Sequence, residues 1–211
     1  MSVPWPPPEF PVPSPPGRTP PGAPQPVAVP IVDVGAGVAR DSLAEQRRIL
    51  VSGILDREVV TSLAAQLMAF DGLSSRDVEI LLNSSGGPVS DFLPVLDVFD
   101  LMRAKVNVTV IGSVSGTAVG LVAAGTGERR AAPHARFSLR LDATQAIHGT
   151  AEDITRHAGE LAHQRARYLA ALAAATGQDE GVLAEQLDRG RTRTAEEARA
   201  MGIVDGIAGQ P

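Results

Sequence analysis

Residues 108–125 read VTVIGSVSGTAVGLVAAG, and this stretch decides how the rest of the chain is interpreted. Its first residues complete an apolar run over Val106–Ile111 that is typical of a buried strand, and a turn of small residues follows. The remaining Ala, Val, Gly and Leu residues predict a helix that is small enough to be buried. Strand-to-helix turns with open backbone N–H groups are where α/β enzymes place a nucleophile and its oxyanion donors.

A second loop of the same kind lies upstream, where residues 83–87 read NSSGG between an apolar strand and a helix. Glycine allows close backbone approach and positive φ, so two such loops side by side form a cradle for an anion. Ser84 and Ser85 are expected to bond to backbone within their own loop.

Composition excludes several classes of function. The net charge is −5 without a run of basic residues, which argues against a nucleic-acid partner. The absence of cysteine excludes disulfides, thiol catalysis and Cys-ligated metal. No apolar run approaches the ~18 residues of a membrane span, and the N-terminus lacks the pattern of a signal peptide. We expect a cytoplasmic protein with no membrane association, no metal and no cofactor.

The N-terminal region differs from the rest, because residues 1–30 hold 13 of the 17 prolines. We predict a disordered, proline-rich tail and transition over residues 1–46, with a helical turn at Asp41–Gln46, followed by one domain over residues 47–211. The tail is either a solvated extension or a docking peptide anchored by Trp5 and Phe10.

From Arg47 onward, short apolar strands alternate with amphipathic helices, which predicts an α/β domain with a parallel sheet. The expected strands are Arg48–Gly53, Asp77–Leu82, Val106–Ile111, Arg129–Ala132, Ala135–Leu141 and a terminal Ile203–Asp205. The expected helices follow an Asp56 cap to Phe70, follow a Ser90 cap to Met102, and cover Ala151–Thr176, Asp179–Leu187 and Thr194–Met201.

The Ala151–Thr176 helix would make about seven turns and end at Gly177. A small sheet cannot cover that length, so one end should project and pack on another subunit. Thr194 and Glu197 have the spacing of a capping box.

Five segments, in order, make the chain similar to the Clp protease proteolytic subunit, ClpP. They read RRILVSGILD, LLNSSGGPVSDFLPVLDVFDLM, VIGSVSGTAVGLVAAGTGERRAAPHARFSL, EDITRHAGEL and TAEEARAMGIVDGI. The resemblance implies a crotonase-like α/β fold of repeated β-β-α units with a long projecting handle helix. It also implies a subunit of stacked rings, an unfolded polypeptide as substrate and an AAA+ unfoldase as partner.

The resemblance places the serine, histidine and aspartate of the family's catalytic triad at Gly116, Arg140 and Gly190. Glycine has no nucleophile, and arginine stays protonated and cannot serve as a general base. The implied oxyanion donors are the backbone N–H groups of Gly87 and Thr117. We therefore predict a catalytically inactive homologue, a pseudoprotease of the serine peptidase family. Its role would be in ring assembly, with itself or with active ClpP subunits.

Three alternatives remain open. An active peptidase could use Ser115 with a displaced histidine, and Asp188 could replace the aspartate; the candidate histidines are His134, His148, His157 and His163. An acyl-CoA enzyme would share the two-amide cradle, but the two loops offer no pair of glutamates as acid and base. A third alternative makes the proline-rich tail the active part, on a multivalent ring platform.

The resemblance also locates an aromatic pocket where the unfoldase docks. Its positions correspond here to Glu79, Leu81 and Leu101. Rings have been replaced by aliphatic chains and a carboxylate, which argues against direct docking of an unfoldase on this subunit.

Overall fold

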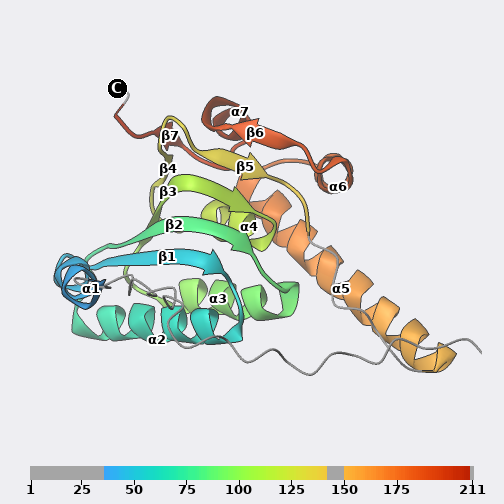
Figure 1. The fold of residues 1–211 in the computed structure, drawn as a ribbon, viewed down its shortest axis with the longest axis horizontal. Helices are drawn as coiled ribbons and strands as arrows, with labels where there is room; N and C mark the ends of the chain where they lie inside the picture. The colour runs from blue at the N-terminus through green and yellow to red at the C-terminus, as the bar shows by residue number, and fades with distance from the viewer. Residues whose placement is uncertain (1–35, 142–149, 210–211) are drawn as a thin grey trace, which may run out of the picture. The chain divides into compact units, whose positions relative to one another are not determined.

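A computed structural model describes residues 36–141 and 150–209 (Figure 1). Strands and helices alternate along the chain, as the sequence predicts. In order they are α1 (Ala36–Glu45), β1 (Arg48–Ile54), α2 (Arg57–Leu73), β2 (Val78–Gly86), α3 (Val89–Leu101), β3 (Val106–Ser115), α4 (Thr117–Ala123), β4 (Arg129–Ala131), β5 (Arg136–Ser138), α5 (Ala151–Thr176), α6 (Glu180–Arg189), β6 (Thr192–Thr194), α7 (Ala195–Ala200) and β7 (Gly206–Ile207).

The strands form one sheet in the order β1-β2-β3-β4-β7, and all of these neighbours are parallel. The predicted parallel sheet is therefore confirmed. β5 runs parallel to the end of β3 and carries β6 on its other edge as an antiparallel strand. Strand β6 was not predicted, because a strand of three residues depends on its partner rather than on its own periodicity.

Strand β3 changes neighbours along its length, and this change brings β5 toward the turn that follows β3. Val108–Val110 pair with β4, whereas Ser113–Ser115 pair with β5. The irregularity between the two halves lies at Gly112, whose φ is +76°. The Asn83 side chain on β2 stabilises this point, because its Oδ1 accepts from the Ser113 amide at 3.1 Å.

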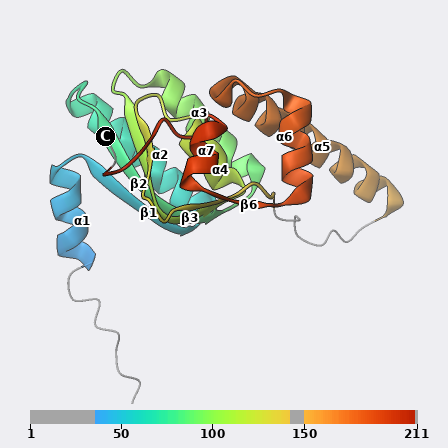
Figure 2. The same cartoon turned by 90° about the horizontal axis from the view of Figure 1, so that it is seen from above.

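Helices cover one face of the sheet, and the core lies between the two layers (Figures 1 and 2). Alternate residues of β2, Val78, Ile80 and Leu82, are completely buried, whereas Glu79 and Leu81 between them are only half-buried. This period of two is that of a sheet with one covered face. It places two of the predicted docking positions, Glu79 and Leu81, on the face opposite the helices.

The long helix α5 has the predicted bounds and stop. It begins after a Thr150–Asp153 capping box and ends at Gly177, whose φ of +70° is a left-handed cap. Its buried residues, Tyr168, Leu169 and Leu172, all lie in its second half. The first half projects away from the sheet (Figure 1), which confirms the predicted handle.

Two of the three predicted N-caps are confirmed. The Asp56 side chain accepts from the Val59 amide, and Thr194 and Glu197 form their capping box. The Ser90 cap is wrong, because α3 begins at Val89 and the cap position, two residues before Ser90, is occupied by Pro88 without a side-chain bond. The Pro88 carbonyl accepts from the amides of Asp91 and Phe92, so the first turn forms without a polar side-chain cap.

Both ends of the domain also differ from expectation. Instead of one turn at Asp41–Gln46, helix α1 extends over ten residues. The terminal strand is β7, three residues beyond the predicted Ile203–Asp205, because pairing with β4 takes place at Gly206 and Ile207. Among the described residues no helix has the length and apolarity required to span a bilayer.

Candidate functional site

The loop after β2 and the turn after β3 lie against each other, and glycine makes this approach possible. A Cβ atom built on Gly86 would lie 2.5 Å from the carbonyl oxygen of Ser115 and 3.0 Å from the amide nitrogen of Thr117. A Cβ on Gly87 would lie 1.9 Å from the carbonyl oxygen of Leu55. No other residue fits at either position without moving backbone.

Gly116 forms a sharp elbow between β3 and α4, with φ +53° and ψ −126°. Three contacts hold this elbow. The Gly116 amide donates to the carbonyl of Ser138 at 3.0 Å, and its carbonyl accepts from the Val119 amide at 3.1 Å and from the Tyr168 hydroxyl at 2.9 Å. Burial raises the pKa of the Tyr168 hydroxyl above its usual value, so this group remains a donor. The elbow is therefore joined to β5 and to α5.

Tyr168 also packs against the helix that follows the elbow. Its ring meets the ring of Phe92 edge-on, with the centroids 5.6 Å apart. A Cβ built on Gly120 would lie 2.6 Å from the Tyr168 ring and 2.9 Å from the Phe92 ring. Gly120 thus makes room for the two aromatic side chains that support the site from the core.

Arg140 lies between the other two triad positions. Its carbonyl oxygen would be 2.9 Å from a Cβ built on Gly116, and its Cδ would be 3.2 Å from a Cβ built on Gly190. Gly190 has φ +59° and ends α6 as a left-handed cap. The three positions assigned from the resemblance thus meet in space, although they are far apart in the sequence. The side chains of these three residues themselves include no hydroxyl, imidazole or carboxylate.

The two expected oxyanion donors are adjacent, but one of them already has an acceptor. The Gly87 amide donates to Thr117 Oγ1 at 2.8 Å, and the same hydroxyl donates to the Gly87 carbonyl at 3.0 Å. The neighbouring Gly86 amide donates to Ser84 Oγ at 3.0 Å, and Ser84 Oγ donates to the Gly53 carbonyl at 2.6 Å. The predicted bonding of Ser84 to backbone is confirmed. The role of the Thr117 hydroxyl was not predicted.

Ser115, the fallback nucleophile, is half-buried and pairs in register with Ser138. His134 is exposed in the turn that precedes β5, four residues before Ser138. His163 is also exposed, and it precedes Tyr168 on α5 by about 7.5 Å of helix. No described histidine is brought beside Ser115 by these elements.

The remaining candidates are distributed as follows. His157 lies in the projecting half of α5, and His148 lies outside the described residues. Asp188, the candidate substitute aspartate, forms an exposed ion pair with Arg165 at 2.7 Å. Its carboxylate is therefore engaged with α5 on the surface.

The predicted docking positions lie on two different parts of the surface. Glu79 forms an ion pair with Arg48 at 2.7 Å and accepts from the Thr109 hydroxyl at 3.1 Å, so a polar row crosses β1, β2 and β3. Leu81 is half-buried beside it. Leu101 at the end of α3 is 79% exposed. The carboxylate is thus satisfied within the sheet face.

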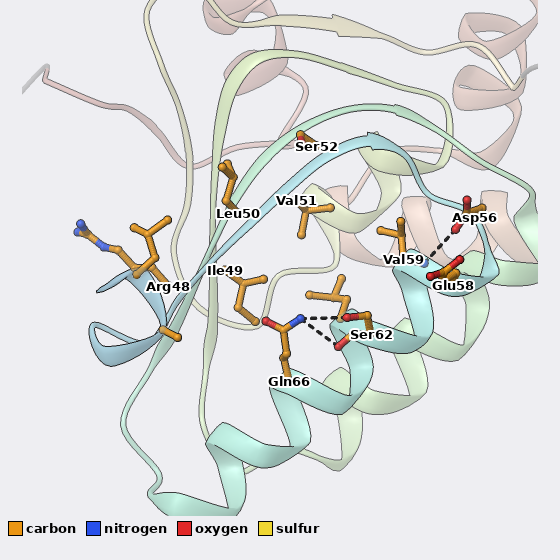
Figure 3. Close-up of a pocket in the computed structure, with 13 residues that line it drawn as sticks. Arg48, Ile49, Leu50, Val51, Ser52, Asp56, Glu58, Val59, Ser62 and Gln66 are labelled. Carbon is orange, nitrogen blue, oxygen red and sulfur yellow. Dashed lines mark hydrogen bonds between the residues drawn. The ribbon is translucent and has the colours of Figure 1, made fainter. Parts of the chain in front are cut away.

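A separate groove of about 510 Å³ follows β1, with α1 and α2 as its walls (Figure 3). None of the three triad positions lines it. The Gln66 side chain donates to the Ser62 carbonyl and hydroxyl, and Asp56 caps α2 (Figure 3). These contacts engage Asp56 and Gln66 with α2, and the described residues that line the groove include no histidine or lysine. Within residues 36–141 and 150–209, no three His, Asp or Glu side chains gather to hold a metal ion.

Comparison with known proteins gives consistent matches. The family model described as Clp protease matches residues 36–211. The ATP-dependent Clp protease proteolytic subunit 1 of Thermobifida fusca is 31% identical over 169 residues, which are 79% of this chain and 76% of that protein. The putative ATP-dependent Clp protease proteolytic subunit-like protein of Streptomyces coelicolor is 34% identical over 168 residues, covering 78% and 80%.

The fold has a match among solved structures. The ClpP protease catalytic domain of Plasmodium falciparum superposes with a TM-score of 0.73, covering 83% of this chain and 94% of that one. The sequence identity is 21%, so this likeness concerns the fold alone. It confirms the predicted α/β fold class.

Proposed function

The chain belongs to the Clp protease family, and on that premise we propose that it is a subunit that does not hydrolyse peptides. One observation carries the proposal: Gly116, Arg140 and Gly190 come together around the Arg140 carbonyl and side-chain stem. A serine-type mechanism needs a nucleophile and a base in hydrogen-bond reach of each other. Glycine and arginine provide neither.

The scaffold around these positions supports a structural role. The elbow conformation at Gly116 is retained, and Ser138, Val119 and Tyr168 all bond to it. This backbone conformation costs ~1–3 kcal/mol for a residue with a side chain. Glycine at position 116 avoids that cost, so the elbow can form without strain.

We propose that the assembly is a ring with identical or active subunits, in which the projecting half of α5 contacts another subunit. Ile154 on this half is 45% exposed, and no residue before Tyr168 on α5 is buried. Exposed apolar side chains on an unsupported helix are typical of an interface. The subunit would then shape the assembly or access to the chamber, and cytoplasmic location is part of this proposal.

Unfoldase docking on this subunit is proposed to be weakened. The polar row Arg48–Glu79–Thr109 crosses the sheet face where the resemblance expects aromatic rings. An apolar docking loop that covered this face would have to desolvate the ion pair, and burying a charge is costly unless its pairing is complete. Mixed assemblies would therefore present fewer docking sites than assemblies of active subunits.

The test uses the full-length purified chain with a fluorogenic peptide and a serine-reactive fluorophosphonate. We expect no turnover and no labelled serine, and Ser115→Ala should give the same result as the unchanged chain. Labelling of Ser115, or turnover that Ser115→Ala abolishes, would show the active peptidase instead. The mass of the assembly, measured with and without a co-expressed active ClpP-type subunit, tests the ring proposal independently.

A further inference from the structure

Thr117 occupies a position from which its hydroxyl controls the backbone of Gly87. Its side chain is completely buried directly after the elbow. A threonine hydroxyl has one donor and two acceptor lone pairs. Here it accepts from the Gly87 amide at 2.8 Å and donates to the Gly87 carbonyl at 3.0 Å. Both polar backbone groups of Gly87 are therefore satisfied by one side chain 30 residues away.

The loop has little freedom to turn this amide elsewhere. Gly87 lies so close to the end of β1 that a Cβ would be 1.9 Å from the carbonyl oxygen of Leu55. The Leu55 amide in turn donates to the Gly86 carbonyl at 3.0 Å. Gly87 is thus held between Leu55 on one side and Thr117 on the other.

From this arrangement we propose that Thr117 is a positioning residue that closes the anion site. An oxyanion of a peptide-like substrate can be stabilised only by donors that point at it, at roughly 2.7–3.1 Å. At Gly87 that place is taken by the Thr117 hydroxyl. The site therefore lacks a nucleophile and also has one of its two expected amide donors occupied, and these are two separate reasons for inactivity.

This inference deepens the proposed function and rests on it only for the location of the oxyanion site. The missing triad removes bond cleavage, whereas the Thr117 hydroxyl occupies the Gly87 amide, one of the two expected donors to the tetrahedral anion. Filling positions 116, 140 and 190 with reactive side chains would leave the Gly87 amide occupied. The residue that decides whether this loop can bind an anion is Thr117.

Residue-resolved hydrogen–deuterium exchange on the full-length protein tests the proposal. The variants are Thr117→Val, which keeps the shape and removes the hydroxyl, and Thr117→Ser, which keeps the hydroxyl. Protection of the Gly87 amide is expected in the unchanged chain and in Thr117→Ser, with exchange about tenfold faster in Thr117→Val. The Gly86 amide, bonded to Ser84, is the internal control and should be unchanged.

The outcomes are distinct. Unprotected exchange at Gly87 in the unchanged chain overturns the inference without any variant, and so does equal exchange in Thr117→Val and the unchanged chain. Pro88 has no amide hydrogen, so the Gly87 signal is not mixed with that of its successor. Fluorophosphonate labelling of Ser115 would overturn the proposed function, while the exchange at Gly87 would still decide the role of Thr117.

Discussion

Placing a methyl group at the elbow tests whether the site can still accept a side chain. In Gly116→Ala the new Cβ would lie 2.9 Å from the Arg140 carbonyl oxygen, at a backbone φ of +53°. A side chain in such a conformation costs ~1–3 kcal/mol, and overpacking against backbone costs a further ~1–3 kcal/mol. The lower entropy of alanine in the unfolded chain returns ~0.4–1 kcal/mol. We expect a net loss of about 1–6 kcal/mol of unfolding free energy.

Two other glycines separate the contributions. Gly53 has φ +88° with no atom within 4 Å of its added Cβ, so Gly53→Ala carries strain without contact. Gly159 lies in α5 with open space around it, so Gly159→Ala should stabilise by ~0.5–1 kcal/mol as a helix substitution. Gly116→Ala should therefore be the most destabilising of the three.

The assay is urea unfolding with linear extrapolation, at one fixed protein concentration because association contributes to apparent stability. The informative quantity is the difference in unfolding free energy between Gly116→Ala and Gly53→Ala. If this difference is below ~0.5 kcal/mol, the contact with the Arg140 carbonyl costs nothing and the reasoning is refuted. Such a result would mean that the segment after β5, which carries Arg140, moves aside readily.

Two further substitutions test the supports of the site and of the C-terminal region. Tyr168→Phe removes a buried hydroxyl that donates to the Gly116 carbonyl, and this carbonyl keeps its bond from the Val119 amide. We expect the free energy of unfolding to fall by about 0.5–1.5 kcal/mol in urea unfolding. An unchanged unfolding midpoint would contradict the hydrogen bond. The side-chain hydrogen bond from Arg129 lowers the pKa of the Asp205 carboxyl, so the stability it contributes is full above about pH 4 and is lost as pH falls through the lowered pKa. Asp205→Asn should therefore flatten the acid limb of a stability–pH curve, and an identical limb in both proteins would exclude this pair as a cause.

The sequence alone determined the parts of this protein whose signals are local. The alternation of strands and helices, the Asp56 cap, the Gly177 stop and the Thr194 capping box depend on periodicity and neighbours within one turn. The motifs around Gly116 identify the family in the same way, because each segment is continuous in the chain.

Tertiary structure decided what depends on partners distant in sequence. Strands β6 and β7 have too few residues for a periodic signal and exist because β5 and β4 pair with them. The Thr117–Gly87 bond and the approach of Arg140 to Gly116 and Gly190 join segments from different elements. Such contacts depend on the relative placement of β2, β3 and β5 to within an ångström. Sheet register and packing set that placement, and no local residue pattern encodes it.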